Sequence, residues 1–305
     1  MKKLLYSLLV LLITSPAIGQ EFKKIVKKNV KFTEEYFVLR ENQSLKQGSY
    51  LKTYSYLTNP TYVLEIGRYD NNMKSGKWLN FYAEPSNSLE SAGFSQEGKK
   101  EGEWKYFYPF KSKNNSVLFS LGIGKRTFLI DNKNNKREKE VEFDSVGQHI
   151  MAKGIYINDK KFGVWEYYSN SGLILNKYDH SSKKMIFNQI YDEQNSFIVF
   201  LGGKERFSTL FVLLLQNDQT TVNVDSQVSF VLETINDSVV YKLTDARGSS
   251  NYKNKIVQIL HTIPNDWIIL DSLSHKKFQI KSSSITIRDE SRTGTMDNLD
   301  FNVID

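Results

Sequence analysis

The 305-residue sequence contains no cysteine, and after its first residues it has no apolar run of about 18 residues. Without cysteine the chain cannot form a disulfide framework, a thiolate metal site, a cysteine nucleophile or a lipoprotein anchor. The longest later apolar stretch, 197–215, is interrupted by the glycine and charged residues of 202–206. We therefore expect no transmembrane helix beyond the N-terminal segment.

Histidine is also scarce, and the sequence has no motif typical of a catalytic site. The four histidines lie far apart and lack the His-x3-His or His-Glu-x2-His spacing of zinc sites: His149, His180, His261 and His275. The consecutive residues Asp179-His180-Ser181 cannot form a triad, whose members come from distant elements. The glycines of 122–126 and 202–204 lack the spacing of a phosphate-binding loop. We predict no enzymatic activity, no metal and no cofactor.

The N-terminus has the organisation of a secretory signal. Lys2 and Lys3 precede the apolar stretch 4–13, and Ala17-Ile18-Gly19 places small residues at the usual cleavage positions. We predict a signal peptide at 1–19 and a periplasmic or secreted protein with no transmembrane anchor after cleavage. The formal net charge of +7 is modest, and with export it disfavours nucleic acid as a partner. The lysine-rich stretch 21–35 is interpreted as a solvated connector or, alternatively, as a segment lying on a membrane surface.

An aromatic–glycine pattern occurs three times in the first half of the chain. In each copy a second glycine follows the first by nine positions and a tryptophan follows it by eleven. The three copies begin at Gly67, Gly93 and Gly154, and the tryptophans are Trp78, Trp104 and Trp165. Such a repeat indicates stacked supersecondary units that bury their apolar faces jointly.

Alternating aromatic and polar residues around these glycines predict short strands joined by turns. Each copy is interpreted as one β-hairpin, with the second glycine closing the turn. Residues 46–54 look like half of a further unit, a cap, and the interval between the second and third copies is interpreted as a degenerate unit with a charged loop at 131–140. The predicted class is mainly β: an elongated antiparallel hairpin sheet followed by a small α+β domain.

The repeat aromatics allow two interpretations. They could form an exposed ladder that stacks on a ligand, or they could be the hydrophobic core of the repeat, which the repeat architecture favours. The tyrosines two and four positions after each tryptophan are the better candidates for partial exposure, because their hydroxyl groups require a polar partner. The candidate binding residues are Trp78, Tyr82, Trp104, Tyr106, Tyr108, Trp165 and Tyr167.

The pattern Gly-x-Tyr…Gly-x-Trp-x-x-Tyr-Tyr resembles the MORN-type repeat variant of exported bacterial proteins, some of which are labelled antitoxin-like. The resemblance covers about residues 45–180. It implies a repeat architecture and no catalytic role, and we take the repeat domain as 20–182.

The pattern changes after Ser181-Ser182-Lys183-Lys184, which is interpreted as a linker to a second domain at 184–305. Apolar spacing predicts helices over 204–216 and 253–262, and strands over 222–235, 238–244, 267–270 and 278–287. This order resembles a degenerate C-terminal domain of TonB-like energy transducers. The matching residues are Gly202-Gly203…Phe207, Val228-x-Phe230-x-Leu232, Asn236-Asp237, Arg247-Gly248 and Pro264-x2-Trp267.

These observations predict a non-enzymatic, exported binding or scaffold protein of a Gram-negative cell envelope. The repeat sheet would offer an interaction surface, and the C-terminal domain would dock a protein partner, for instance by accepting a strand at a sheet edge, if its TonB-like resemblance is functional. Two alternatives stay open: a carbohydrate- or peptidoglycan-binding module that uses exposed aromatics, and a structural spacer.

Overall fold

The computed structural model describes residues 21–29, 32–54, 62–82, 88–109, 148–190, 198–217, 227–235, 238–247, 250–269, 277–282, 285–287, 294–296 and 299–304. The predicted signal peptide at 1–19, the glycines of 122–126 and the charged loop at 131–140 lie outside these residues. None of the helices in the described ranges is long and apolar enough to cross a membrane.

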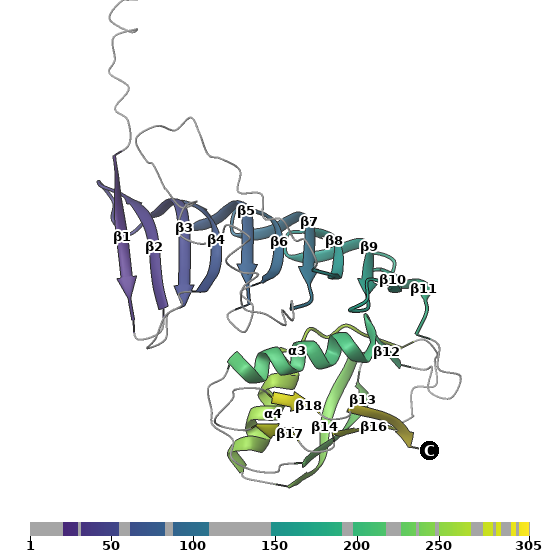
Figure 1. The fold of residues 1–305 in the computed structure, drawn as a ribbon. Helices are drawn as coiled ribbons and strands as arrows, with labels where there is room; N and C mark the ends of the chain where they lie inside the picture. The colour runs from purple at the N-terminus through teal and green to yellow at the C-terminus, as the bar shows by residue number, and fades with distance from the viewer. Residues whose placement is uncertain are drawn as a thin grey trace, which may run out of the picture. The chain divides into compact units, whose positions relative to one another are not determined.

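Within the described ranges, eleven antiparallel strands follow one another in chain order in a single sheet (Figure 1). They are β1 (Phe22–Lys28), β2 (Phe32–Leu39), β3 (Lys46–Tyr54), β4 (Tyr62–Asp70), β5 (Met73–Phe81), β6 (Leu89–Gln96), β7 (Lys99–Phe107), β8 (Ile150–Ile157), β9 (Lys160–Tyr168), β10 (Ile174–Asp179) and β11 (Lys184–Asn188). The predicted class, a mainly β hairpin sheet followed by a small α+β part, is confirmed.

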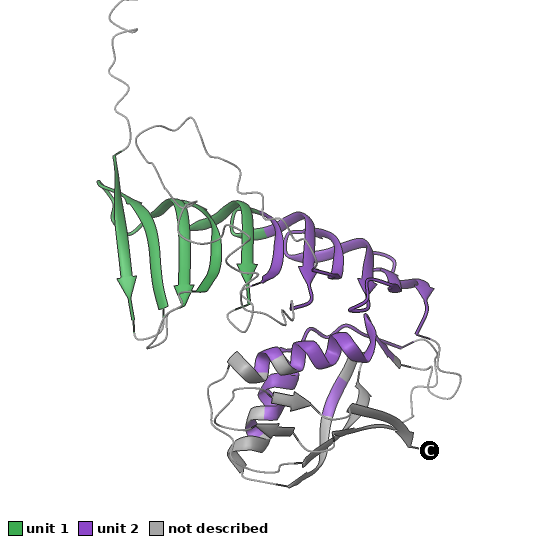
Figure 2. Cartoon of the chain, in the orientation of Figure 1, with its two compact units in different colours: residues 1–87, 95–99, 113–143 green, residues 88–94, 100–112, 144–305 purple. Residues whose placement is uncertain are grey.

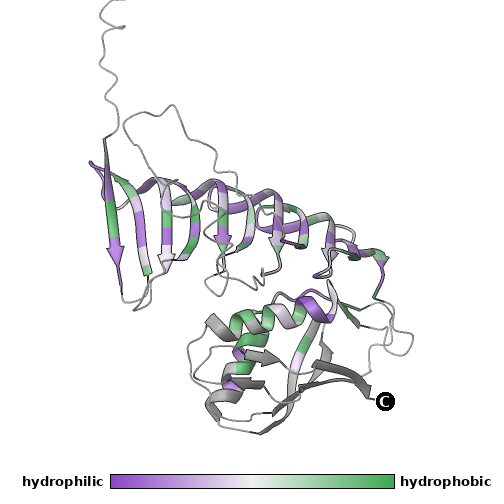
Figure 3. Ribbon diagram, viewed as in Figure 1, coloured by the Kyte–Doolittle hydropathy of each residue, from purple (hydrophilic) through white to green (hydrophobic). Residues whose placement is uncertain are grey.

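The chain divides into two compact units, which Figure 2 distinguishes by colour. Unit 1 comprises residues 1–87, 95–99 and 113–143, and unit 2 comprises 88–94, 100–112 and 144–305. Strands β1–β5 therefore belong to unit 1, whereas β8–β11, the helices and β7 apart from Lys99 belong to unit 2. Strand β6 is divided between the two units after residue 94. Hydrophilic and hydrophobic residues are interspersed along the strands (Figure 3).

The hairpin turns use residues that tolerate positive φ. Both central residues have positive φ in the turns Asn71-Asn72, Glu97-Gly98 and Asn158-Asp159, which matches the right-handed twist of the flanking strands. The second glycine of each repeat was expected to close this turn, and that expectation was wrong. Gly76 and Gly163 lie inside β5 and β9 with φ of 72° and 61°, opposite register shifts of the neighbouring strand. These glycines form β-bulges within the hairpins.

Three interpretations at the ends of the repeats are corrected. The stretch 22–28, expected to be a connector, is the strand β1 and pairs with β2 over its whole length. Residues 46–54 form β3, which is an interior strand between β2 and β4 and no cap. The segment at 181–184 is no linker: residues 180–183 form the turn between β10 and β11, Lys184 begins β11, and the sheet runs to Asn188.

The second and third copies are neighbours in the sheet. Strand β7 pairs directly with β8, with Gly102 opposite Tyr156 and Trp104 opposite Gly154. The interval itself, where a degenerate unit was predicted, lies outside the described residues at 110–147. The hairpin order continues across the interval as if the two copies were consecutive.

The C-terminal part of unit 2 contains two helices, α3 (Gly203–Asn217) and α4 (Ser250–Thr262). Its strands are β12 (Ile198–Phe200), β13 (Gln227–Ile235), β14 (Ser238–Arg247), β15 (Trp267–Ile269), β16 (Lys277–Ser282), β17 (Ile285–Ile287), β18 (Gly294–Met296) and β19 (Leu299–Ile304). Among the described residues they pair as β12–β15, β14–β13–β16–β19 and β17–β18. Both predicted helices are confirmed, because helical and alternating periodicities are well separated here. Strands lie in all four predicted strand regions, of which residues 222–226, 270 and 283–284 lie outside the described residues.

Candidate functional site

Each repeat tryptophan lies flat against the first glycine of its own hairpin. A Cβ atom added to Gly67, Gly93 or Gly154 would lie 2.1–2.3 Å from the ring of Trp78, Trp104 or Trp165. Only glycine leaves room for the indole at this position. The indole nitrogens of Trp104 and Trp165 donate hydrogen bonds to the carbonyl of the residue that follows the glycine, at 2.9 and 3.0 Å. The eleven-residue spacing thus separates each tryptophan from the glycine on which its ring packs.

The predicted binding residues are almost all buried. The three tryptophans, Tyr82, Tyr108 and Tyr167 are each at most 6% exposed, and only Tyr106 is partly exposed. The expected partial exposure is therefore wrong for three of the four tyrosines. Successive rings contact one another, with centroids 6.3 Å apart for Tyr106–Trp165 and 6.3 Å for Trp165–Tyr167. This arrangement is that of a repeat core. A ligand-binding role for the seven residues stays a prediction, and the structure offers no exposed row of rings among them to support it.

A lysine that the sequence analysis missed accompanies every ring. It stands two residues before the second glycine, and its ammonium lies over the aromatic ring four residues later. The distances from Nζ to the ring centroid are 3.9 Å for Lys74–Trp78, 4.7 Å for Lys100–Trp104 and 5.0 Å for Lys161–Trp165. Lys46 and Tyr50 repeat the arrangement at 5.2 Å. These are cation–π contacts, and we call the four residues Lys46, Lys74, Lys100 and Lys161 the ladder lysines.

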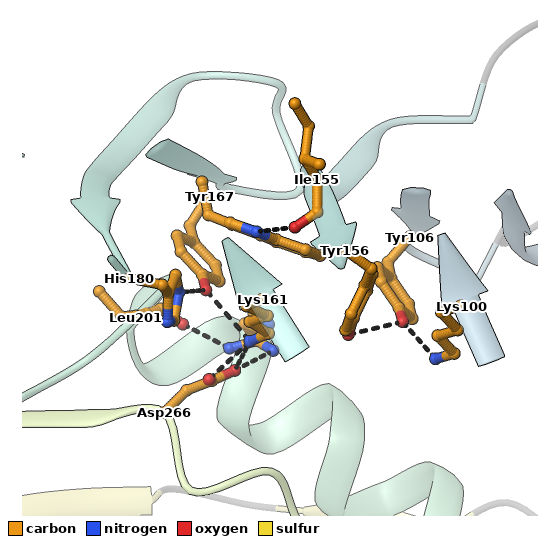
Figure 4. A network of polar contacts seen from close by, with 11 residues as sticks. Lys100, Tyr106, Ile155, Tyr156, Lys161, Tyr167, His180, Leu201 and Asp266 are labelled. Atoms are coloured by element: carbon orange, nitrogen blue, oxygen red, sulfur yellow. Dashed lines mark hydrogen bonds and ion pairs between the residues drawn. The ribbon is translucent and has the colours of Figure 1, made fainter. Parts of the chain in front are cut away.

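In unit 2 the last ladder lysine belongs to a buried ionic cluster (Figure 4). Lys161 Nζ, from β9, donates to both carboxylate oxygens of Asp266 at 2.6 and 2.8 Å. Arg206, from α3, donates to the same carboxylate at 2.7 Å and to the Leu201 carbonyl at 2.7 Å. The Arg206 guanidinium also lies between the rings of Tyr167 and Phe200, 5.1 Å from each centroid. One anion thus joins β9, α3 and the segment that leads into β15.

Hydroxyl groups extend this cluster on either side. The Tyr167 hydroxyl lies 3.1 Å from Lys161 Nζ and 2.8 Å from His180 Nε2. Further along the ladder, Lys100 Nζ donates to the Tyr106 hydroxyl at 2.7 Å, as Figure 4 also shows. The Tyr106 hydroxyl is 3.1 Å from that of Tyr156.

The electrostatics keep Asp266 ionised. Burial raises the pKa of its carboxyl group, but the charges of Lys161 and Arg206 outweigh burial and hold the pKa well below its usual range. Burial, followed by the charge of Lys161, lowers the pKa of His180 to about 4, so this imidazole is neutral at pH 7. Burial also raises the pKa of Tyr167 well above its usual value. Burial lowers the pKa of Lys161, whereas the charge of the Asp266 carboxylate acts to raise it. At neutral pH the Asp266 carboxylate is therefore ionised and paired with Lys161 and Arg206, and the hydroxyl and imidazole groups are neutral.

The cluster has the properties of a buried structural contact between elements of unit 2. Asp266 is 6% and Arg206 5% exposed, and the oxygens of the carboxylate are occupied by protein donors. Within the described part of the chain, only the Nε atom of Arg206 is a buried polar atom of the cluster without a hydrogen-bond partner. A substrate would have to displace several charge-assisted hydrogen bonds to enter. The sequence carried no signal for this cluster, because its three charged residues are separated by 45 and 60 positions and follow no motif.

The opposite face of the last repeat is apolar and accessible. Phe162 and Val164 alternate with Lys161 and Trp165 along β9, so they point away from the rings. They are 49% and 48% exposed, and Ile155, the cross-strand partner of Phe162, is 48% exposed. We call this set the apolar face: Phe94, Ile155, Ile157, Phe162 and Val164. Phe94 is included because it follows its repeat glycine as Ile155 does.

A shallow depression of about 430 Å³ also lies in unit 2, between the residues that follow β7 and the first turns of α3. Two of its lining residues, Glu205 and Asn170, bond to each other, since Glu205 accepts the Asn170 amide hydrogen at 2.9 Å. The hydroxyl of a third, Tyr108, donates to the Tyr168 carbonyl. In the described ranges no group of three or more histidine or acidic residues is placed to hold a metal ion. Comparison of the chain with family models, curated proteins and solved structures finds no match.

Proposed function

We propose that this chain is a non-enzymatic binding scaffold, exported to the cell envelope, whose repeat sheet binds a protein partner through the apolar face of unit 2. The rings that define the repeat hold the hairpins together from the other side of the sheet. On this proposal the sequence signature reports how the surface is built, and the residues between the signature positions determine what it binds.

The observation that carries the proposal is the accessibility of three neighbouring apolar side chains. Ile155, Phe162 and Val164 are each about half exposed on adjoining strands, whereas the repeat places charged residues at the positions equivalent to Val164, Lys77 and Glu103. Burying the exposed half of one such side chain is worth about 1 kcal/mol. Contiguous exposed apolar residues are typical of protein interaction sites.

Charges at the border of the apolar face give it a polar rim. Glu166 lies beside it on β9 and forms ion pairs with Lys153 at 3.0 Å and with Lys177 at 2.8 Å. The two hydrogen-bonding partners Lys177 and Tyr168 lower the pKa of Glu166 to about 2, so the Glu166 carboxylate stays charged at neutral pH. An apolar centre with a charged rim is the usual composition of a protein–protein interface.

A photo-crosslinking amino acid tests the proposal in the native envelope. We would place it at position 162 or 164 of the full-length chain, and at position 173 as the control. Leu173 is 60% exposed and lies beyond the opposite end of β9, so it is accessible but outside the apolar face. We expect a discrete protein adduct from 162 and 164 only.

A second variant ties the adduct to the surface chemistry. Ile155→Lys should abolish the adduct formed from position 162 because it places a charge beside Phe162, and Leu173→Lys should leave the adduct unchanged. Equal adducts from all three positions, or an adduct insensitive to Ile155→Lys, would contradict the proposal. Binding of peptidoglycan fragments in place of a protein adduct would favour the carbohydrate alternative.

A further inference from the structure

The four ladder lysines differ in what their ammonium groups contact besides the rings. Lys161 binds the Asp266 carboxylate at 2.6 Å, Lys74 lies 3.7 Å from the Glu65 carboxylate, and Lys100 donates to the Tyr106 hydroxyl. The ammonium of Lys46 contacts aromatic rings alone among the described residues.

Three tyrosine rings surround the ammonium of Lys46. Its Nζ atom lies 4.6 Å from the centroid of Tyr36, 5.2 Å from that of Tyr50 and 5.0 Å from that of Tyr69. The rings come from β2, β3 and β4 and are all in unit 1. They hold the charge in place through their negative faces without neutralising it.

The backbone at Lys46 is fixed as firmly as its side chain. The Lys46 amide donates to the Asn72 side-chain oxygen at 2.6 Å, and the Asn72 amide donates to the Lys46 carbonyl at 2.9 Å. Lys100 has the same two bonds with Asp159, at 2.6 and 3.1 Å. The backbone of Lys46 is therefore held as that of Lys100 is. Lys46 lacks an anionic partner because no carboxylate among the described residues pairs with it, and not because its backbone is displaced.

We propose that the Lys46 ammonium in its three-tyrosine cage binds a carboxylate side chain of another protein, as Lys161 binds Asp266. Lys161 has the same position in its repeat as Lys46, and the chain supplies Lys161 with a carboxylate, that of Asp266. Lys46 is partly exposed as a residue, and the proposal requires that this exposure include the ammonium group. The site is on the ring-bearing face of unit 1 and does not depend on the apolar face of unit 2.

The acidic groups nearest the cage bear on the strength of this contact. Glu34 accepts a hydrogen bond from the Tyr50 hydroxyl at 3.1 Å, and Glu65 acts electrostatically on both Tyr50 and Tyr69. Neither carboxylate forms an ion pair with Lys46 in the described residues. Their charge weakens the attraction for an anion, so we expect a single modest contact within a larger interface, worth about a five-fold change in affinity.

The test uses the full-length chain and a probe taken from its own sequence. The peptide acetyl-Asn-Asp-Trp-amide reproduces residues 265–267, and acetyl-Asn-Asn-Trp-amide is its uncharged match. Titrations followed by the NMR signals of the Lys46 ammonium and the Tyr36 ring should show about five-fold tighter binding of the acidic peptide. Lys46→Met, which keeps an apolar stem against the rings, should remove that difference, whereas Lys74→Met should retain it.

Three results would overturn the inference. Equal binding of the two peptides, or an acidic preference that survives Lys46→Met, would show that Lys46 selects no carboxylate. If acetate binds as tightly as the acidic peptide, the ligand is a small carboxylate and the assignment to a protein partner is wrong. None of these results bears on crosslinking from positions 162 and 164, so failure here is distinguishable from failure of the proposed function.

Discussion

Replacing Gly154 with alanine should destabilise unit 2 more than replacing the other glycine of the same repeat. The added Cβ would lie 2.3 Å from Trp165 Cδ2 and 2.4 Å from Cε2, whereas ordinary contacts begin near 3.4 Å. Because Trp165 is fully buried, it must move by about 1 Å against its neighbours. Overpacking of this kind costs about 1–3 kcal/mol, and disturbed ring contacts add about 0.5–1.5 kcal/mol. We expect a total near 3 kcal/mol.

Gly163→Ala provides the matched control. At this position nothing lies within 4 Å of the added Cβ, and the cost comes only from a φ of +61°, about 1–2 kcal/mol. Urea unfolding followed by far-UV circular dichroism measures both variants. In a background that already carries Trp165→Val, Gly154→Ala should cost much less than it does in the wild type, because the clash with the ring is absent. Equal costs at the two glycines, or no recovery, would refute the role of Gly154 as the seat of the ring.

Two further predictions concern the buried cluster. Asp266→Asn should destabilise unit 2 by about 3–5 kcal/mol in urea unfolding at pH 7, because it leaves Lys161 and Arg206 as buried cations without a counter-charge. A cost below about 1 kcal/mol would contradict the burial of this ionic cluster. The folded-state pKa of His180 is about 4, below its ordinary 6.5, so the folded state resists protonation and stability should fall as the pH drops from about 6.5 to about 4. His180→Gln should remove that part of the pH dependence, and parallel profiles of the variant and the wild type would show that His180 does not titrate as described.

Local signals in the sequence were enough to predict the class of fold. Aromatic alternation and turn residues predicted the hairpins, and helical spacing predicted α3 and α4 to within a few residues. The limits of the sheet were harder to predict, because β1 is rich in lysine and its charged side chains suggested a solvated connector. A strand at a sheet edge can carry such charges without cost, since one side of it faces water.

The candidate site was predictable only in part. The repeat glycines and tryptophans identified the correct residues, but their spacing did not distinguish a seat for a buried ring from a turn. The ladder lysines were visible as a lysine two positions before Gly48, Gly76, Gly102 and Gly163, and the aromatic signal drew attention away from them. The cluster of Lys161, Arg206 and Asp266 arises from tertiary packing between distant segments, which no local pattern encodes.

Hydroxyl-radical footprinting of the full-length chain tests the central claim most directly, since it reports both faces of the sheet in one experiment. Tryptophan and phenylalanine both react readily when accessible. We expect oxidation at Phe94 and Phe162, which are about half exposed, and protection of Trp104 and Trp165, which are at most 2% exposed. Oxidised tryptophans with protected phenylalanines would show that the ring face is the accessible surface, and would contradict both the burial of the rings and the exposure of the apolar face.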